Sequence, residues 1–349
     1  MGHQDSAGKA DAPPIVGAGP ADAPLSHLGP QWFAIVMGWC GLGVAWHRAQ
    51  PVLGPTADLL SALASLVALG IFLLLAVATV LRWRRHPAAV AADLRHPVRH
   101  AFVAAIPVSL ILLGTLALAH GFGPGLVHAF WIPGVALQFV VTVWVLGRWL
   151  AGLSGWPALS PVLFIPVVGN VLVPLAGIPL GHPNLSWAFF AIGAFFWPIV
   201  VALLLARQSQ QPLPPALQPS WFILVAPPAV IALDVAVLGL GSGPMFAMLG
   251  LAVFSLALAL RIVPRLPRLA FGMPFWALSF PVAAFTALLL RAAQVETALL
   301  WPAVVMLVVV SIIVLGLSLA TLRGLSNHSL LKAEPAPAAP APAPASGGH

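Results

Sequence analysis

Charged residues are scarce in this chain. Only 7% of the 349 residues are Asp, Glu, Lys or Arg, whereas a soluble globular domain carries roughly a quarter. Hydrophobic residues make up 60% of the sequence, and the mean hydropathy is +1.02. A fold surrounded by water needs a polar shell that this composition does not supply. An ordinary water-soluble enzyme is therefore excluded.

Cysteine and tyrosine are almost absent too, with one cysteine, Cys40, and no tyrosine. A single thiol excludes a disulfide framework and any Cys-based zinc or iron–sulfur site. Thirteen Arg against two Lys, with abundant Ala, Leu and Pro, are typical of a bacterial GC-rich genome. The formal charge of +7 is typical of a nucleic-acid-binding protein. The positions of the basic residues along the chain decide whether they serve that role.

The two ends of the chain lack long apolar runs. Residues 1–28 are rich in Ala, Pro, Gly and Asp, and no charged stretch leads into an apolar core as in a signal peptide. Residues 324–349 end in an Ala/Pro tract, which is typical of an extended chain. We expect two disordered cytoplasmic tails around a transmembrane domain at 29–323.

Ten apolar runs of about 20 residues fill the region between the tails, which is the length of one helical membrane crossing. They lack the polar alternation of barrel strands, so the sequence predicts an all-α integral membrane protein with ten transmembrane helices. The predicted spans are 30–47, 57–81, 100–120, 126–149, 159–180, 185–207, 220–240, 244–263, 272–292 and 297–322.

The cations lie at one end of these spans. With both termini in the cytoplasm, 13 of the 15 Lys and Arg residues fall inside, and only Arg48 and Arg291 fall outside. The positive-inside rule therefore predicts this orientation in a bacterial inner membrane. It also removes nucleic acid as a partner, because the basic residues mark topology and face the lipid bilayer.

Helix breakers recur in the odd-numbered spans. The residues Gly38, Pro107, Pro166, Pro227 and Pro281 are separated by 69, 59, 61 and 54 residues, and each step is one pair of helices. A phenylalanine lies close before each breaker. Such self-similarity indicates a repeated unit, so we expect five hairpins whose odd helices kink and line a central pore. A ring of five helices whose axes are about 9 Å apart leaves a central hole about 2.7 Å in radius, whereas a ring of four leaves about 1.4 Å. Five is therefore the smallest simple ring that could pass a small ion.

Few polar side chains are available to line this pore. Asp234 in span seven either is satisfied structurally near the outer end or couples transport to protons. Asn170 either bonds a backbone group freed by Pro166 or offers its amide to an anion. The remaining uncharged candidates are Ser109, Ser279 and Thr286. The histidines cluster at span ends, and no pair faces another across the membrane centre, so neither a metal nor another cofactor is predicted.

Phe280 is the candidate gate, because a large apolar ring in a narrow pore blocks it by occlusion and dewetting. An ordinary packed phenylalanine is the alternative that the residues alone leave open.

Several short motifs resemble the tellurite-resistance/dicarboxylate transporter family, which includes the TehA-type anion channels and the plant slow anion channels. They are HPVR at 96–99, FIPVVGN at 164–170, LRIVP at 260–264 and WALSFP at 276–281. The resemblance implies five quasi-symmetric hairpins, a homotrimer with a pore in each protomer, and occlusion by an aromatic residue of the ninth helix, at Phe280 here.

These observations predict a channel or permease, not an enzyme, for small inorganic or organic anions. Chloride, nitrate, tellurite or sulfite fit better than dicarboxylates, because no buried arginine pair is visible to clamp two carboxylates. The alternative is a proton- or gradient-coupled exporter of sulfite or of C4-dicarboxylates such as malate.

Overall fold

The computed structural model describes residues 24–331, and this part of the chain contains helices and no strands. The expected tails lie largely outside it, at 1–23 and 332–349. The helical region extends into both expected tails, because Pro24–His27 form a short 3-10 helix and the last helix, α13, ends at Ser326.

Eight helices of the described part are long and apolar enough to cross a membrane. They are Pro55–Arg85, Arg99–Ala119, Pro124–Leu150, Pro183–Gln210, Pro215–Val237, Ser242–Arg268, Met273–Ala292 and Thr297–Ser326. The first and fifth predicted spans do not meet this criterion. The first corresponds to α1, Ala34–Arg48, an α-helix of 15 residues, and the fifth to the shorter apolar helix Pro161–Gly177.

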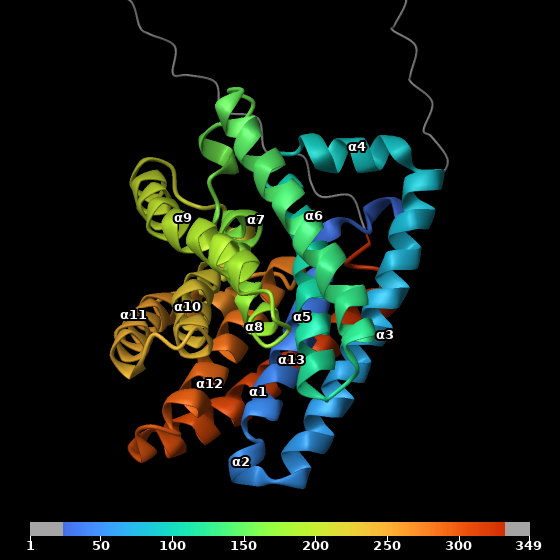
Figure 1. The fold of residues 1–349 in the computed structure, drawn as a ribbon. Helices are drawn as coiled ribbons and strands as arrows, with labels where there is room; N and C mark the ends of the chain where they lie inside the picture. Colours follow the sequence, from blue (N-terminus) through green and yellow to red (C-terminus); the bar gives the residue numbers. More distant parts are fainter. Residues whose placement is uncertain (1–23, 332–349) are drawn as a thin grey trace, which may run out of the picture.

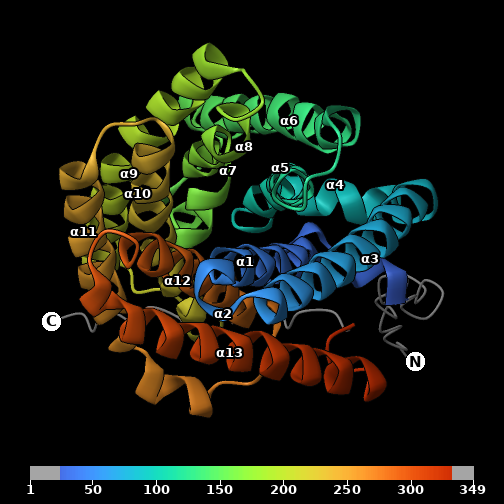
Figure 2. The ribbon, with the colours of Figure 1, turned by 60° about the horizontal axis from the view of Figure 1, so that its bottom comes forward.

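The chain forms an inner and an outer layer (Figure 2). The inner segments contact one another in a closed cycle, in which each odd-numbered span touches the next and the ninth touches the first. In chain order their α-helices are α1, α5 (Ala105–Ala119), α7 (Phe164–Val168) with α8 (Pro174–Gly177), α10 (Ala226–Val237) and α12 (Ser279–Ala292).

The outer layer consists of five long α-helices, each packed on the inner segment that precedes it. They are α3 (Pro55–Arg85), α6 (Pro124–Leu150), α9 (Pro183–Gln210), α11 (Ser242–Leu260) and α13 (Leu300–Ser326). In their most apolar windows only 22% to 39% of the residues are buried, against 67% to 78% for the three long inner segments. Helices whose exposed faces are as apolar as their buried faces require lipid as their solvent.

Each inner segment begins as a 3-10 helix and continues as an α-helix. The 3-10 stretches are η2 (Pro30–Phe33), η3 (Arg99–Ala104), η5 (Pro161–Leu163), η7 (Pro215–Val225) and η9 (Met273–Leu278). All four breaker prolines occupy the second or third position of the α-helix that follows. Proline is tolerated there because the first N–H groups of an α-helix have no intrahelical acceptor. The prolines therefore mark a change of helix type, from 3-10 to α, in these four segments.

Gly38 differs from the prolines, because α1 runs through it without interruption. A Cβ atom at this position would lie 2.4 Å from Ser279 Oγ, and one at Gly41 would lie 2.9 Å from Ala283 Cβ. Both distances are too short for real contacts. The two glycines therefore allow α1 to approach α12 closely, and this approach closes the inner ring.

Candidate functional site

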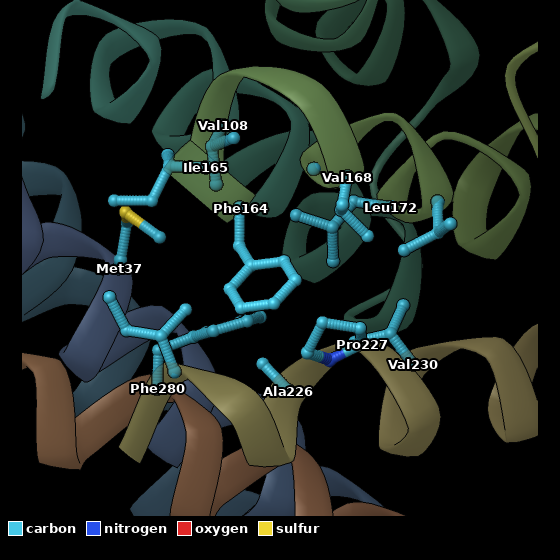
Figure 3. Close-up of a pocket in the computed structure, with 13 residues that line it drawn as sticks. Met37, Val108, Phe164, Ile165, Val168, Leu172, Ala226, Pro227, Val230 and Phe280 are labelled. Carbon is cyan, nitrogen blue, oxygen red and sulfur yellow. The ribbon is translucent and has the colours of Figure 1, made fainter. Parts of the chain in front are cut away.

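A narrow cavity lies where the five inner segments meet (Figure 3). Its volume is about 40 Å³, enough for a few water molecules at most. Almost every lining group is apolar. One or more side chains from each inner segment contribute, including Met37 of α1, Val108 of α5, Val168 of α7, Pro227 of α10 and Phe280 of α12.

Two aromatic rings reach into this cavity. Figure 3 shows the Phe164 ring in its middle and the Phe280 ring extending toward it from the other side. A Cβ atom at Gly41 would lie 3.1 Å from Phe280 Cδ2, so α1 supports the ring from behind. The sequence prediction singled out Phe280 and missed Phe164. The signal was present, because Phe164 precedes Pro166 as Phe280 precedes Pro281.

The other three repeat phenylalanines, Phe33, Phe102 and Phe222, are buried and are not among the residues that line the cavity. Phe33 packs edge-on against Phe72 of α3 with ring centroids 5.8 Å apart. The repeat therefore supplies aromatic rings in five places, and two of them are turned inward.

The predicted polar candidates are buried but do not line the cavity. Ser109 Oγ donates to Ala105 O at 2.6 Å, Ser279 Oγ to Trp276 O at 2.6 Å, and Thr286 Oγ1 to Val282 O at 2.8 Å. Each hydroxyl thus satisfies a backbone carbonyl of its own segment, a bond that such residues commonly form in helices.

Asn170 belongs to a polar cluster between α6 and the broken fifth segment. Its Nδ2 donates to Val167 O at 2.8 Å and to Thr142 Oγ1 at 3.0 Å. Gln138 Nε2 donates to Ile165 O and Pro166 O, both at 3.1 Å, and Thr142 Oγ1 donates to Pro166 O at 2.6 Å. These side chains compensate the carbonyl groups that the change of helix type leaves without an intrahelical donor, as apolar surroundings demand.

Asp234 of α10 is fully buried. Neither carboxylate oxygen has a hydrogen-bond partner among the described residues, so the polar neighbour that the sequence analysis allowed for is absent from this part of the chain. Such a carboxylate inside a membrane helix is costly if charged, and it marks a functional candidate.

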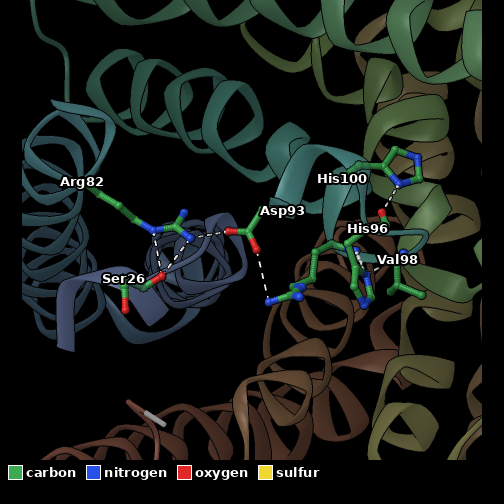
Figure 4. A network of polar contacts seen from close by, with 7 residues as sticks. Ser26, Arg82, Asp93, His96, Val98 and His100 are labelled. Carbon is green, nitrogen blue, oxygen red and sulfur yellow. Dashed lines mark hydrogen bonds and ion pairs between the residues drawn. The ribbon is translucent and has the colours of Figure 1, made fainter. Parts of the chain in front are cut away.

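The cation-rich end of the molecule holds a buried ion-pair network (Figure 4). Asp93 of α4 (Pro87–Arg95) lies 2.7 Å from Arg82 Nη2 and 3.2 Å from Arg99 Nη1. The Arg82 guanidinium also donates to Ser26 O at 3.0 and 3.2 Å. His96 Nδ1 accepts from the backbone of residues 98 and 99, both at 3.1 Å. Through Asp93 and Arg99 the HPVR motif thus joins α3 and α4 to the second inner segment, and its role there is structural.

At the other end of the molecule three potential metal ligands come together, two of them histidines that the sequence places at span ends. The ligand atoms of His47, Asp58 and His120 lie within 4.8 Å of one another. His47 Nδ1 is 4.0 Å from Asp58 Oδ1, and His120 Nε2 lies 3.1 Å from Ser65 Oγ. The sequence spacing of 11 and 62 residues carries no metal motif, which explains why sequence reasoning missed this group.

Two layers of apolar helices around a narrow cavity define a multi-pass membrane protein of the channel and permease type. Residues 27–322 match the SLAC1 family, described as voltage-dependent anion channel. The chain belongs to this family.

Curated relatives are consistent with this assignment. The chain is 24% identical to the tellurite resistance protein TehA homolog of Haemophilus influenzae, over 72% of this chain and 77% of that protein. It is 29% identical to the S-type anion channel SLAH2 of Arabidopsis thaliana, over 56% of this chain and 38% of SLAH2. It is 28% identical to the uncharacterized transporter MJ0576 of Methanocaldococcus jannaschii, over 75% and 83% of the two chains.

Proposed function

We propose that this protein is an anion channel or permease of the bacterial inner membrane. Small anions such as chloride, nitrate, tellurite or sulfite would pass through the ring of inner segments. The observation that carries the proposal is the cavity at the centre of this ring, to which all five inner segments contribute. One relative is named an anion channel and another a tellurite resistance protein, which favours the same substrates.

Phe280 is the gate in this proposal, and Phe164 completes it. The cavity that they share is nearly free of polar groups and holds only about 40 Å³. An anion entering it would lose its hydration shell without gaining hydrogen bonds, so the two benzyl rings form a barrier by occlusion and dewetting.

Selectivity for anions does not arise from basic side chains in the central cavity, because none lines it. In this proposal it comes from the oriented backbone dipoles of the inner helices and from the arginines at the ends of the pathway.

We also propose ten crossings, with both termini in the cytoplasm, and a homotrimer with one pathway in each protomer. The orientation rests on arginines that lie in or directly after the last turn of every outer helix. Such a distribution follows the positive-inside rule. The proposal of a homotrimer rests on the resemblance of the sequence motifs to the tellurite-resistance/dicarboxylate transporter family.

The direct test compares chloride efflux from liposomes that contain wild-type protein or the Phe280→Ala variant. Removing the ring opens the cavity, and a barrier lowered by only ~1.4 kcal/mol raises the flux about tenfold. Equal and low efflux from both proteins would contradict the gate and the pathway.

A gradient-coupled exporter of sulfite or C4-dicarboxylates such as malate is the second candidate, and Asp234 is the observation that favours it. A buried carboxylate without a bonding partner among residues 24–331 is suited to carry a proton across the membrane. Transport by this mechanism would depend on a pH gradient and would lose that dependence in Asp234→Asn. Transport by the wild type that ignores the pH gradient would contradict coupling.

A further inference from the structure

A second, larger cavity lies at the end of the inner ring opposite α4, near the short helix α2 (Gln50–Leu53) (Figure 1). Its volume is about 290 Å³. Its lining comes from the ends of α1 and α5, from α8 and from the turn after α12, which are parts of four of the five inner segments. The polar lining residues are His47, Arg48, Gln50, Thr115 and Gln294.

The two cavities lie along the same helix faces. On α1 Met37 lines the central cavity and Val44 the larger one, and on α5 Val108 and Thr115 do the same. Residues seven apart share one face of an α-helix and are separated by about 10.5 Å along its axis. The larger cavity is therefore a vestibule two helical turns beyond the central cavity, on the same axis.

This vestibule gathers the cations of its end of the molecule. Arg48 and Arg291 are the two Lys or Arg residues that the topology places on this side, and they lie close enough for their charges to repel each other. Arg291 Nη1 donates to Gln294 Oε1, and Gln294 lines the vestibule. Arg48 at the end of α1 thus lines the vestibule directly, and Arg291 at the end of α12 acts on it through Gln294.

No carboxylate neutralises these arginines within the described part of the chain, where neither forms an ion pair. The acidic groups of this end are engaged elsewhere. Asp58 lies 4.0 Å from His47 Nδ1, and Glu296 accepts from the backbone N–H of Ala298 at 3.3 Å. Partly buried guanidinium groups that repel each other lack a counter-ion, and a bound anion would supply it.

We propose that the vestibule is an anion-binding site in which Arg48, with Gln294 held in place by Arg291, captures one halide or small oxyanion before it reaches the phenylalanine gate. The proposal rests on the proposed function, because it assigns the entrance of the same pathway. The guanidinium groups replace part of the hydration shell of the anion, which lowers the cost of moving it toward the apolar cavity.

A binding experiment tests this site without requiring transport. Thermal unfolding of the purified protein in detergent is followed while sodium nitrate or sodium chloride is titrated at constant ionic strength, with sodium gluconate as the balancing salt. A ligand that binds only the native state raises the midpoint temperature once its concentration exceeds the dissociation constant, in proportion to ln(1 + [anion]/Kd). We expect this logarithmic rise for the wild type, and its onset gives the dissociation constant of the anion.

The Arg48→Gln and Arg291→Gln variants should raise the dissociation constant of the anion about tenfold each, because each loses a charge that assists binding. Arg48→Lys, which keeps the charge, should recover part of this loss. Arg323→Gln, in the last turn of α13 and away from the vestibule, is the matched control and should behave as the wild type. Absence of stabilisation by either anion, or equal dissociation constants in the wild type and the two vestibule variants, would overturn the site.

Conductance separates this inference from the proposed function. In the Phe280→Ala background, Arg48→Gln should raise the half-saturating chloride concentration for current by a similar factor when chloride is added on the α2 side. A Phe280→Ala protein that passes no anion current would overturn the channel function and leave the binding result intact. A current whose saturation is unchanged by Arg48→Gln would overturn the entrance role alone.

Discussion

At the residue scale, the proposed function depends on which side chains point into the central cavity. Phe280 and Phe164 belong to a set of five repeat-related phenylalanines, and these two line the central cavity. The small hydroxyl residues that were candidates for lining a pore bond to backbone carbonyls. In the proposed pathway the middle of the membrane is therefore closed by apolar groups.

The first residue-scale prediction concerns Phe164. If the two rings close the cavity together, Phe164→Ala should raise chloride efflux from liposomes, and the double variant with Phe280→Ala should exceed either single variant. Each ring needs to account for only ~1.4 kcal/mol of the barrier to give about a tenfold rise.

Phe222→Ala is the matched control for this experiment. Phe222 precedes Pro227 as Phe164 precedes Pro166, and it is buried but is not among the cavity-lining residues. Its truncation should cost stability, about 3–5 kcal/mol as for other buried phenylalanines, without raising efflux. An efflux that rises equally in Phe222→Ala would indicate a leak through a loosened protein and not an opened gate.

At the element scale, the inner segments combine two helix types, and the outer helices do not. A 3-10 helix rises about 2.0 Å per residue against 1.5 Å for an α-helix, so a short inner segment spans more of the membrane than its length suggests. The carbonyl groups exposed by the change are compensated from α6 by Gln138 and Thr142. The outer layer is therefore a hydrogen-bonding partner of the inner layer as well as its contact with lipid.

The close approach of α1 to α12 gives a prediction at this scale. Gly41→Ala should lower the unfolding temperature, because the added Cβ would meet Ala283 and Phe280, and such overpacking costs about 1–3 kcal/mol. In the Phe280→Ala background the cost should be smaller, since one of the two obstructing groups is gone. Thermal unfolding of the four proteins in detergent measures this coupling.

Gly70→Ala on α3 provides the control, because a Cβ atom there meets nothing within 4 Å. Alanine is the better helix former by roughly 1 kcal/mol, so this variant should be as stable as the wild type or slightly more so. If Gly41→Ala and Gly70→Ala had the same effect, the contact between α1 and the gate would not exist in solution.

At the scale of the whole molecule, the distribution of cations predicts the orientation. Gln211 lies in the loop after α9 and Leu240 in the loop after α10, and both side chains are exposed. In a Cys40→Ser background, Leu240→Cys should react with a membrane-impermeant maleimide in intact spheroplasts. Gln211→Cys should react only after lysis, and the reverse pattern would contradict the orientation.

The sequence predicted much of this architecture because membrane solvation restricts the choices. Long apolar runs must be helices, and the cations label their ends. It was less successful where packing decides the length of a helix. The first and fifth spans were predicted at 30–47 and 159–180, and in the structure their apolar helices, Ala34–Arg48 and Pro161–Gly177, are shorter. The prolines predicted special segments but not a 3-10 helix, because proline fits both a kink and a first turn.

The candidate site residues also differ in how far the sequence alone predicts them. Phe280 could be predicted because it follows both the repeat and the resemblance. The position of Phe164 in the cavity lining and the absence of Phe222 from it could not, since side-chain direction depends on neighbouring segments far apart in the chain. The meeting of Arg48 with Arg291 is equally invisible in the sequence, because 243 residues separate them and only closure of the ring joins their helix ends.

The most direct test of the central claim is the reversal potential of Phe280→Ala protein in a planar bilayer under a potassium chloride gradient. The account predicts currents well above those of the wild type, reversing close to the equilibrium potential of chloride. Reversal near the equilibrium potential of potassium, or currents no larger than those of the wild type, would contradict an anion pathway closed by this ring.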